Sequence, residues 1–218
     1  MQSTPSEMPS IEANVRFKGA KVSPRRLHRL DFLANRPEVR KPYILSLEEQ
    51  HKFFNELPIH LRQMAVFQVN TGCREKELCE LQWSWERAVP EFNTSVFMVP
   101  CVSTTSHVVV LNNQAKVVLE QQRGLHPTHV FAYNGHPVRH ITIHFAWKRA
   151  REKVGLPQLS ILDLRRTFQQ RLDEAGVGLQ DRQELLGWHQ RTSDYSNDYS
   201  DEQLCHWIKA ANKICARA

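Results

Sequence analysis

The sequence predicts a mainly α-helical fold with one small antiparallel β-sheet. Apolar residues recur at helical spacing along most of the chain after residue 42, whereas only residues 95–111 are rich in β-branched and aromatic side chains. Two capping boxes mark helix starts, Ser46 with Glu49 and Ser200 with Gln203. In a capping box, each side chain satisfies a backbone N–H group that the first helical turn leaves without a partner. Many helices and a single hairpin together define the predicted class.

The first 41 residues are expected to form a basic, partly disordered arm before a domain over residues 42–218. They contain four prolines and little periodicity, with room for one short helix around residues 24–34. The arm carries nine Lys and Arg residues against four acidic ones, a net charge of +5, and the rest of the chain carries +1. This asymmetry indicates a polyanionic partner. The alternative is a solvated tail without a partner.

Three helices are expected at the start of the domain. The first begins at the Ser46 capping box and continues to Leu57, where a proline interrupts the chain. The second covers residues 60–70 and ends at Gly72, and the third covers residues 74–81. A hairpin then follows, with strands SVFMVP at 95–100 and HVVVL at 107–111 and a six-residue loop between them.

Five more helices are expected after the hairpin, over residues 114–122, 141–154, 162–175, 179–186 and 201–213. In the helix over 162–175, Leu164, Phe168 and Leu172 recur at four-residue spacing and should form one buried stripe. The glycine at 176 is its expected C-cap. Arg165, Arg166 and Gln169 lie off the stripe, and ordinary surface charge is the alternative interpretation of the two arginines.

Composition excludes several classes of protein. The 218 residues are 41% hydrophobic and 24% charged, as in ordinary globular proteins. No apolar run approaches the roughly 20 residues that span a bilayer, and the N-terminus lacks the charged and apolar regions of a secretory signal. We therefore expect a cytoplasmic protein without a membrane partner. Five cysteines without CxxC spacing are expected to be small apolar residues.

Histidine pairs raise the question of a metal site. The chain contains HPTH at 126–129 and a second pair, His140 and His144. However, no pair of cysteines lies near either one, and the segment looks like a turn. We therefore predict no metal site.

Four features follow one another in a specific order along the domain. They are TGCREKEL at 71–78, the hairpin, DLRRTF at 163–168 and LLGWH at 185–189, and a tyrosine then precedes the last helix. Each motif alone is weak. In this order and spacing they resemble the catalytic domain of tyrosine recombinases of the phage-integrase type, over roughly residues 42–215. The resemblance implies that fold and an activity in site-specific DNA recombination or integration.

The resemblance also implies a chemistry without metal or other cofactor. A tyrosine attacks a DNA phosphate and forms a 3′-phosphotyrosyl link, through an anionic transition state that fixed cations must stabilise. Arg74 and Arg165 match the two family arginines, whose guanidinium groups bind phosphate oxygens in a bidentate manner. Glu77, one helical turn after Arg74, is expected to orient it. Trp188 stands at a position where the family most often has histidine, and its indole N–H can donate; His189 is the alternative phosphate donor.

Two tyrosines are candidates for the nucleophile. Tyr199 directly precedes the Ser200 capping box, where it can pair with Leu204 as a hydrophobic staple, and a tyrosine before a polar turn and an amphipathic helix matches the family. Tyr195 belongs to the near-repeat SDYSNDYS and is the alternative nucleophile. The family spacing from Gly187 falls between the two, and the following helix favours Tyr199.

The sequence departs from the family at two supporting positions. Leu162 occupies the place of the histidine three residues before the second arginine. The family also places a lysine in the hairpin to protonate the leaving oxygen, but no lysine lies between Lys76 and Lys116. His107 is the titratable residue of this region and is expected to face along the second strand. Loss of a general acid typically costs about a hundred- to ten-thousand-fold in rate.

Two functions therefore remain open. One is a DNA-cleaving and rejoining recombinase, and the other is a catalytically inactive DNA-binding or assembly module with the same fold. In both, the implied partner is double-stranded DNA and the location is the nucleoid. The family assembles as tetramers in which the last helix docks into a neighbour, here through apolar Leu204, Trp207, Ile208 and Ile214. The alternative is that this helix docks on its own domain.

Overall fold

The computed structural model describes residues 41–100, 107–188 and 199–215, and it confirms the predicted fold class. One compact unit extends from Pro42 to Ala218. The basic arm, the short helix expected around 24–34 and the hairpin loop at 101–106 lie outside the described residues. Within the described part, no helix has the length and apolar character needed to cross a membrane.

The first three helices form close to where caps and periodicity predict them. They are α2 (Leu47–Glu56), α3 (Ile59–Thr71) and α4 (Glu75–Glu80). Ser46 Oγ accepts a hydrogen bond from Glu49 N at 3.2 Å, and Glu49 Oε2 accepts one from Ser46 N at 3.0 Å, so the first capping box is confirmed. Gly72 ends α3 with a φ of 66°, a left-handed conformation that glycine adopts without steric cost.

The later helices agree equally well with the prediction. They are α5 (Asn113–Gln122), α6 (His140–Lys153), α7 (Ile161–Glu174), α8 (Leu179–Leu185) and α9 (Asp201–Asn212). The stripe of Leu164, Phe168 and Leu172 on α7 is completely buried. A capping box between Ser200 and Gln203 starts α9, as predicted.

The β structure is larger than the sequence predicts. The expected hairpin is present as β2 (Thr94–Val99) and β3 (His107–Val110), but β1 (Glu86–Val89) adds a third antiparallel strand, and Phe97 of β2 lies between Glu86 and Val109. Two short strands, β4 (Ala132–Tyr133) and β5 (His136–Pro137), form a separate pair. The prediction of one sheet is therefore wrong. The edge strand β1 was missed because its sequence, ERAV, mixes charged and apolar residues without a strand pattern.

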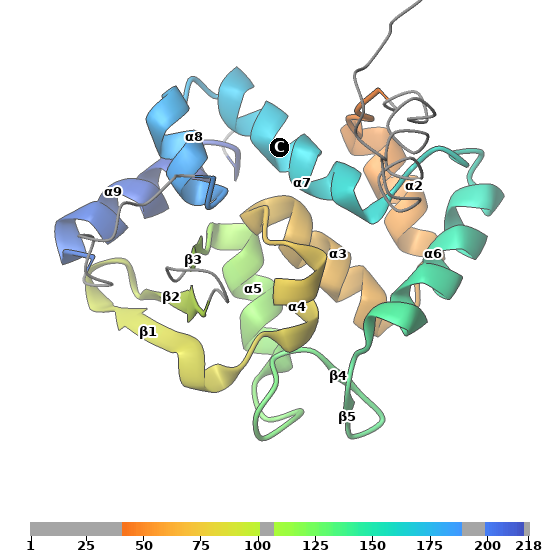
Figure 1. Cartoon of the computed structure of the whole chain (residues 1–218), viewed down its shortest axis with the longest axis horizontal. Coiled ribbons are helices and arrows are strands. Elements are labelled where there is room, and N and C mark those ends of the chain that lie inside the picture. Colours follow the sequence, from red (N-terminus) through yellow and green to blue (C-terminus); the bar gives the residue numbers. More distant parts are fainter. Residues whose placement is uncertain (1–40, 101–106, 189–198, 216–218) are drawn as a thin grey trace, which may run out of the picture. The chain divides into compact units, whose positions relative to one another are not determined.

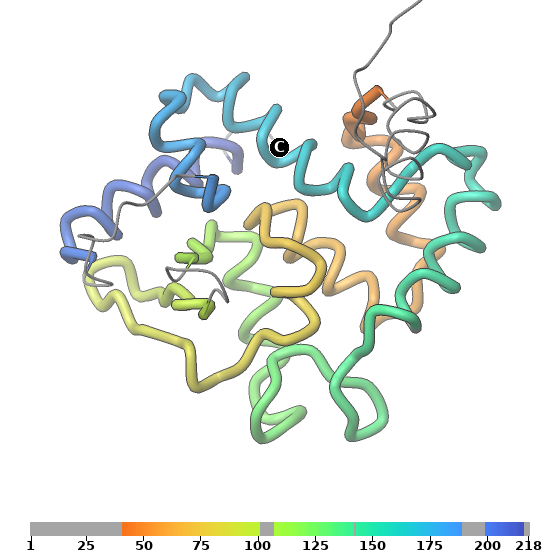
Figure 2. The backbone as a smooth tube through the Cα atoms, in the orientation of Figure 1, coloured from red at the N-terminus to blue at the C-terminus, as the bar shows by residue number. Residues whose placement is uncertain are grey.

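Two apolar clusters hold these elements together. Helix α3 lies centrally between α5 and α7 and contributes Phe67 and Val69 to the first cluster, together with Phe53 from α2 and Trp147 from α6 (Figures 1 and 2). The second cluster joins the three-stranded sheet to α7, α8 and α9. Its buried members include Val108, Phe168, Leu186, Leu204 and Trp207. The turn at Gly72 lies directly against Phe168 and Leu186, so three of the segments that carry the integrase-like motifs meet there.

Candidate phosphate-binding site

Arg74 lies where α3 gives way to α4. It is the N-cap residue of α4, directly after the turn at Gly72, and this position directs its side chain across the start of the helix. Arg74 Nη1 donates to Glu77 Oε1 at 2.5 Å, and the Arg74 backbone N–H donates to Glu77 Oε2 at 2.7 Å. The pairing expected from the spacing is therefore present. With 42% of its side chain exposed, Arg74 remains accessible to a ligand.

Arg165 is buried, so the alternative interpretation of this residue as ordinary surface charge is wrong. Its Nη1 donates to the carbonyl oxygen of Gly72 at 2.5 Å, its Nη2 donates to that of Leu186, and only 4% of the residue is exposed. Burial, assisted by the nearby charge of Arg74, lowers the pKa of Arg165 to about 10. The guanidinium remains protonated at neutral pH. Sequence reasoning missed this burial because the acceptors are main-chain groups from other segments.

The two guanidinium groups converge on one turn after α8. Arg165 donates to Leu186 O, and Arg74 Nη2 donates to Gly187 O at 2.9 Å. Consecutive carbonyl groups therefore hold the two arginines side by side. A guanidinium carries five N–H groups, and the side-chain hydrogen bonds that each arginine makes to the described residues use two of them. Two adjacent cations with further donors can bind an oxyanion such as a phosphate.

Close packing against His107 fixes the same turn. Gly187 has a φ of 59°, and a Cβ atom added there would lie 2.5 Å from His107 Cδ2. The ring of His107 is buried, with Nδ1 at 3.2 Å from Glu77 Oε2 and Nε2 at 3.4 Å from Leu185 O. Both ring nitrogens therefore face an oxygen acceptor. His107 thus links the sheet to the carboxylate that orients Arg74.

Glu77 is ionised at the centre of this arrangement. Burial by itself would raise the pKa of Glu77, but His107 and the main-chain and side-chain donors of Arg74 outweigh burial and lower this pKa to about 2. The sequence predicted the contact with Arg74 and not the one with His107. The signal available for His107 was its place at the start of a buried strand, where a polar side chain requires a partner.

Trp188 is accessible beside the arginines. Half of the residue is exposed, at 49%, and Arg165 Cζ lies 5.7 Å from the centroid of its ring, so Trp188 is not a core residue. His189, the alternative donor, lies outside the described residues. Arg74, Glu77, Arg165 and Trp188 therefore come together from α4, α7 and the turn after α8.

The comparison with protein-family models decides the family. Residues 44–202 match the model described as the phage integrase family. The chain belongs to the phage integrase family. Among curated proteins of this family, the integrase of Salmonella phage P22 is 26% identical over 158 residues, which is 66% of this chain and 40% of the phage protein.

Solved structures of phage integrases and related recombinases have the same fold. A lambda integrase dimer bound to a COC′ core site superposes with a TM-score of 0.57 at 23% identity, over 81% of this chain and 51% of that one. A lambda integrase tetramer bound to a Holliday junction gives 0.58 at 21% identity, over 79% and 58%. The XerH recombinase bound to its difH substrate gives 0.53 at 18%, over 78% and 51%. The chain thus spans about half the length of these integrases.

Tyr199, the favoured integrase nucleophile, is buried. Only 5% of it is exposed, and its ring packs edge-on against Trp207 of α9, with 5.3 Å between ring centroids. Leu204 is also buried in the same cluster, which fits the hydrophobic staple expected at the start of α9. Attack on phosphate by Tyr199 requires its phenol to leave this packing. The alternative nucleophile Tyr195 lies outside the described residues.

The structure describes one of the two positions at which the sequence departs from the integrase pattern. Leu162, in place of the family histidine, is 53% exposed on α7 and contributes an apolar surface where a donor or proton acceptor would stand. The hairpin loop that carries the lysine of the family lies outside the described residues.

Among the described cysteines, Cys73 is buried, and Cys79, Cys205 and Cys215 are half-buried; all four are free thiols.

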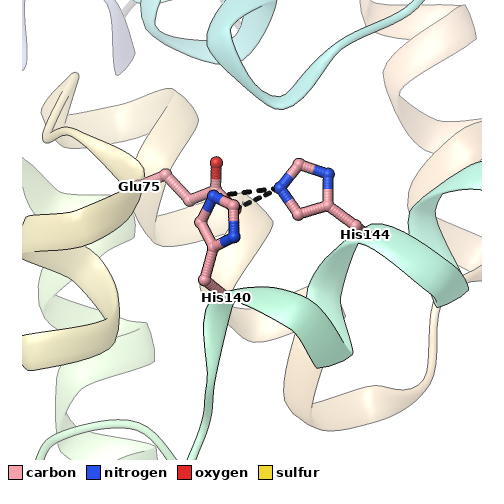
Figure 3. A group of neighbouring side chains, drawn as sticks. All are labelled: Glu75, His140 and His144. Atoms are coloured by element: carbon pink, nitrogen blue, oxygen red, sulfur yellow. Dashed lines mark hydrogen bonds and ion pairs between the residues drawn. The ribbon is translucent and has the colours of Figure 1, made fainter.

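One group of side chains in the described part of the chain could hold a metal ion. Glu75 of α4 meets His140 and His144 of α6, and Figure 3 shows both imidazole rings close to the carboxylate. The prediction of no metal site considered only cysteine partners for these histidines. Glu75 is far from them in the sequence, so no motif could reveal this group.

Proposed function

We propose that this chain is the catalytic part of a site-specific tyrosine recombinase that cleaves and rejoins double-stranded DNA. The observation that carries the proposal is the convergence of two anchored guanidinium groups, Arg74 and Arg165, on the carbonyl groups of Leu186 and Gly187. Such a preorganised pair stabilises the charge that develops on a phosphate during transfer. Trp188, half exposed beside Arg165, is the proposed donor of an indole N–H to the same phosphate.

The proposed reaction conserves the phosphodiester energy. The tyrosine oxygen loses its proton and attacks phosphorus, the P–O5′ bond breaks, and the leaving 5′-oxygen takes up a proton. A 5′-hydroxyl group from a second duplex later attacks the phosphotyrosyl link and releases the tyrosine. One ester bond forms as another breaks in each step, so neither ATP nor a redox cofactor is required. Tyr199 is the proposed nucleophile, with Tyr195 as the alternative.

The alternative function is a DNA-binding or assembly module that lacks the chemistry. Three observations favour it: Leu162 replaces a polar residue, the sequence has no lysine between Lys76 and Lys116, and the Tyr199 phenol is buried. Removal of one oxyanion donor costs about 10²–10³ in rate. Together with a missing general acid, this loss would leave a protein that binds the phosphate backbone and turns over slowly or not at all.

DNA and further copies of the chain are the proposed partners. The basic N-terminal 41 residues would attract the phosphate backbone, and the proposed location is the nucleoid in the cytoplasm. Lambda integrase forms a tetramer on a Holliday junction, and we extend tetramer formation on DNA to this chain. The apolar side of α9, with Leu204, Trp207 and Ile208, is buried against its own domain. Assembly through α9 would therefore exchange this contact for an equivalent one on a neighbour.

Covalent trapping tests the proposal. The full chain is incubated with nicked duplexes made from the DNA that flanks its own gene, and SDS-resistant protein–DNA adducts are measured beside gel-shift binding. An adduct lost in Tyr199→Phe and kept in Tyr195→Phe supports the recombinase and its nucleophile; the reverse pattern assigns Tyr195. Binding of these duplexes without any adduct establishes the inactive module instead. A folded chain that binds no DNA, including a mixed-sequence duplex, contradicts both functions.

A matched pair of arginine variants isolates the phosphate site. Arg74→Gln should lower the rate of adduct formation by about 10²–10³, because it removes one cation from the transition state. Arg149→Gln removes an exposed arginine from α6, outside the site, and should leave the rate unchanged. Equal effects of the two variants would mean that Arg74 contributes only general positive charge.

A further inference from the structure

The start of α4 and the start of α6 bring together three side chains that the phosphate site does not use. Glu75 is the first residue of α4, next to Arg74, and His140 is the first residue of α6. His144 follows one turn later, so the two imidazole rings project from the same face of α6. Two histidines at this spacing on a helix are a common arrangement for binding zinc in proteins.

The ligand atoms of these side chains converge. Glu75 Oε1 lies 3.2 Å from His140 Nε2 and 3.1 Å from His144 Nε2, and the two Nε2 atoms are 3.0 Å apart. A tetrahedral zinc ion with bonds of about 2.0–2.1 Å separates neighbouring ligand atoms by about 3.3 Å. The three atoms therefore already form a triangle close to one face of a zinc coordination sphere (Figure 3).

The carboxylate oxygen at this point requires a partner. Glu75 Oε1 is buried from solvent and accepts no well-directed hydrogen bond from the described residues, although both imidazole nitrogens lie close to it. A buried acceptor without a hydrogen bond is costly. The Nε2 atoms of the two rings also face each other at 3.0 Å, and each Nε2 atom can carry at most one proton for a hydrogen bond at this point. A cation between the three atoms satisfies all of them.

We propose that Glu75, His140 and His144 bind a divalent cation of the zinc class and thereby tie the start of α4 to α6. Imidazole nitrogen together with one carboxylate oxygen suits Zn²⁺, Co²⁺ and Ni²⁺ better than Mg²⁺ or Ca²⁺, which take oxygen ligands. Three protein ligands leave the fourth position to water or to an external ligand. The histidine side chains are 62% and 52% exposed, so an ion can enter from solvent.

The competing occupant of this site is a proton. An imidazolium at either position would pair with Glu75 and satisfy its oxygen without any metal. Because protons compete with the cation for the imidazole nitrogens, the test is made at pH 7.5. Thiolate ligands are a second alternative, because Cys79 lies on α4 together with Glu75.

The experiment uses the full chain without an affinity tag, treated with chelator and dialysed. Zn²⁺ binding is measured by calorimetry, and Co²⁺ is used as a spectroscopic probe. We expect one ion per chain with the strong visible bands of tetrahedral Co²⁺ and without the near-ultraviolet band of a cobalt thiolate. Zn²⁺ at one hundred times its Kd should raise the melting temperature by about 5–10 °C.

Variants decide whether these three residues form the site. His140→Ala, His144→Ala and Glu75→Gln should each weaken Zn²⁺ binding at least tenfold and reduce the thermal shift. His136→Ala removes an exposed histidine of β5 and should change neither quantity. The proposal is overturned if the chain binds no ion, if a thiolate band appears, or if affinity is unchanged in both histidine variants. Because both histidines are largely exposed, circular dichroism should show that the variants remain folded.

Discussion

Arg165 shows how a single side chain can combine a structural and a chemical role. It is buried, yet it stays charged because its hydrogen bonds go to the carbonyl groups of Gly72 and Leu186. These carbonyl groups belong to the turn after α3 and the turn after α8. The side chain that we propose binds phosphate therefore also joins two distant segments of the domain.

Replacing Arg165 should destabilise the fold as well as the phosphate site. Arg165→Ala leaves two buried carbonyl groups without donors, and we expect the free energy of unfolding to fall by about 2–4 kcal/mol. Urea denaturation at pH 7 measures the change. Arg149→Ala, at an exposed position, should stay within about 0.5 kcal/mol of the parent chain. A loss below 1 kcal/mol for Arg165→Ala would mean that the two turns hold their positions without it.

Gly187 offers a second test at the residue scale. An alanine there must adopt a positive φ and place its Cβ against the ring of His107, so we expect Gly187→Ala to cost about 2–5 kcal/mol of unfolding free energy. Gly176→Ala is the matched control, because its φ is 70° and the space around it is open. It should cost only about 1–2 kcal/mol. Equal costs would show that His107 moves aside freely.

At the site, the sequence predicted the contact between residues that are close together along the chain. The pairing of Arg74 with Glu77 follows from helical spacing, and it was predicted. The contacts of Arg165 with carbonyl oxygens and of His107 with Glu77 depend on folding, and no side-chain pattern encodes main-chain acceptors from distant turns. Leu162, which occupies the place of the family histidine, lies exposed on α7.

At the scale of elements, α7 depends on an acidic cap. Asp163 Oδ2 accepts hydrogen bonds from Ser160 N at 2.8 Å and from Ser160 Oγ at 2.7 Å, and Asp163 Oδ1 lies 3.0 Å from Arg166 Nη1. Burial would raise the pKa of Asp163, but the donors of Ser160, Arg166 and the Tyr43 backbone outweigh burial and hold this pKa below its usual value. The start of the helix that carries Arg165 thus requires an ionised carboxylate.

This cap predicts acid sensitivity. A carboxyl group with a lowered folded-state pKa contributes its full stability above the unfolded pKa of about 3.9 and loses it as the pH falls further. In Asp163→Asn, unfolding free energy should therefore depend less steeply on pH below about 4. Chemical denaturation at a series of pH values measures the slope. Asp173→Asn removes a half-exposed carboxylate of the same helix that pairs with Arg182 at the surface. Because exposed ion pairs contribute little to stability, this variant should stay closer to the parent slope than Asp163→Asn does. A parent slope in Asp163→Asn would contradict the role of the cap.

The apolar side of α9 can pack either on its own domain or on a neighbouring copy of the chain. Leu204 is completely buried and Trp207 is 8% exposed in the described structure. If this packing is the resting state, Leu204→Ala should cost about 2–5 kcal/mol in a monomer without DNA. Urea denaturation at several protein concentrations measures both the cost and any dependence on assembly. A cost below 0.5 kcal/mol in the monomer would show that α9 does not rest on its own domain.

The sequence predicted helices well because their signals are local. Caps such as Ser46 with Glu49 and stripes such as Leu164 with Phe168 lie within a few residues of each other. Strand β1 and the pair of β4 and β5 were missed, because short strands of mixed polarity acquire their identity from the strand beside them. Tertiary pairing, which a single sequence does not display, decides such elements.

For the whole molecule, charge is divided unevenly along the chain. The formal net charge is +6, and +5 of it belongs to residues 1–41. If DNA is the partner, Arg25→Gln with Arg26→Gln should weaken binding and reduce the slope of log K against log salt by about 0.9 for each lost phosphate contact. Fluorescence anisotropy at 50–200 mM salt measures the slope. Lys148→Gln with Arg149→Gln changes two exposed cations of α6 and serves as the control; identical slopes for the parent and the arm variant would exclude the arm from the interface.

The carbonyl groups of Leu186 and Gly187 impose an unusual pattern of mutational tolerance on this chain. They belong to the main chain, so replacement of the half-exposed Trp188 side chain would leave these two acceptors in place. A deletion or insertion of one residue between 185 and 188 would instead shift both acceptors at once and separate the cations. Among natural relatives, the length of this turn and the glycine at position 187 should therefore vary less than the residue at position 188.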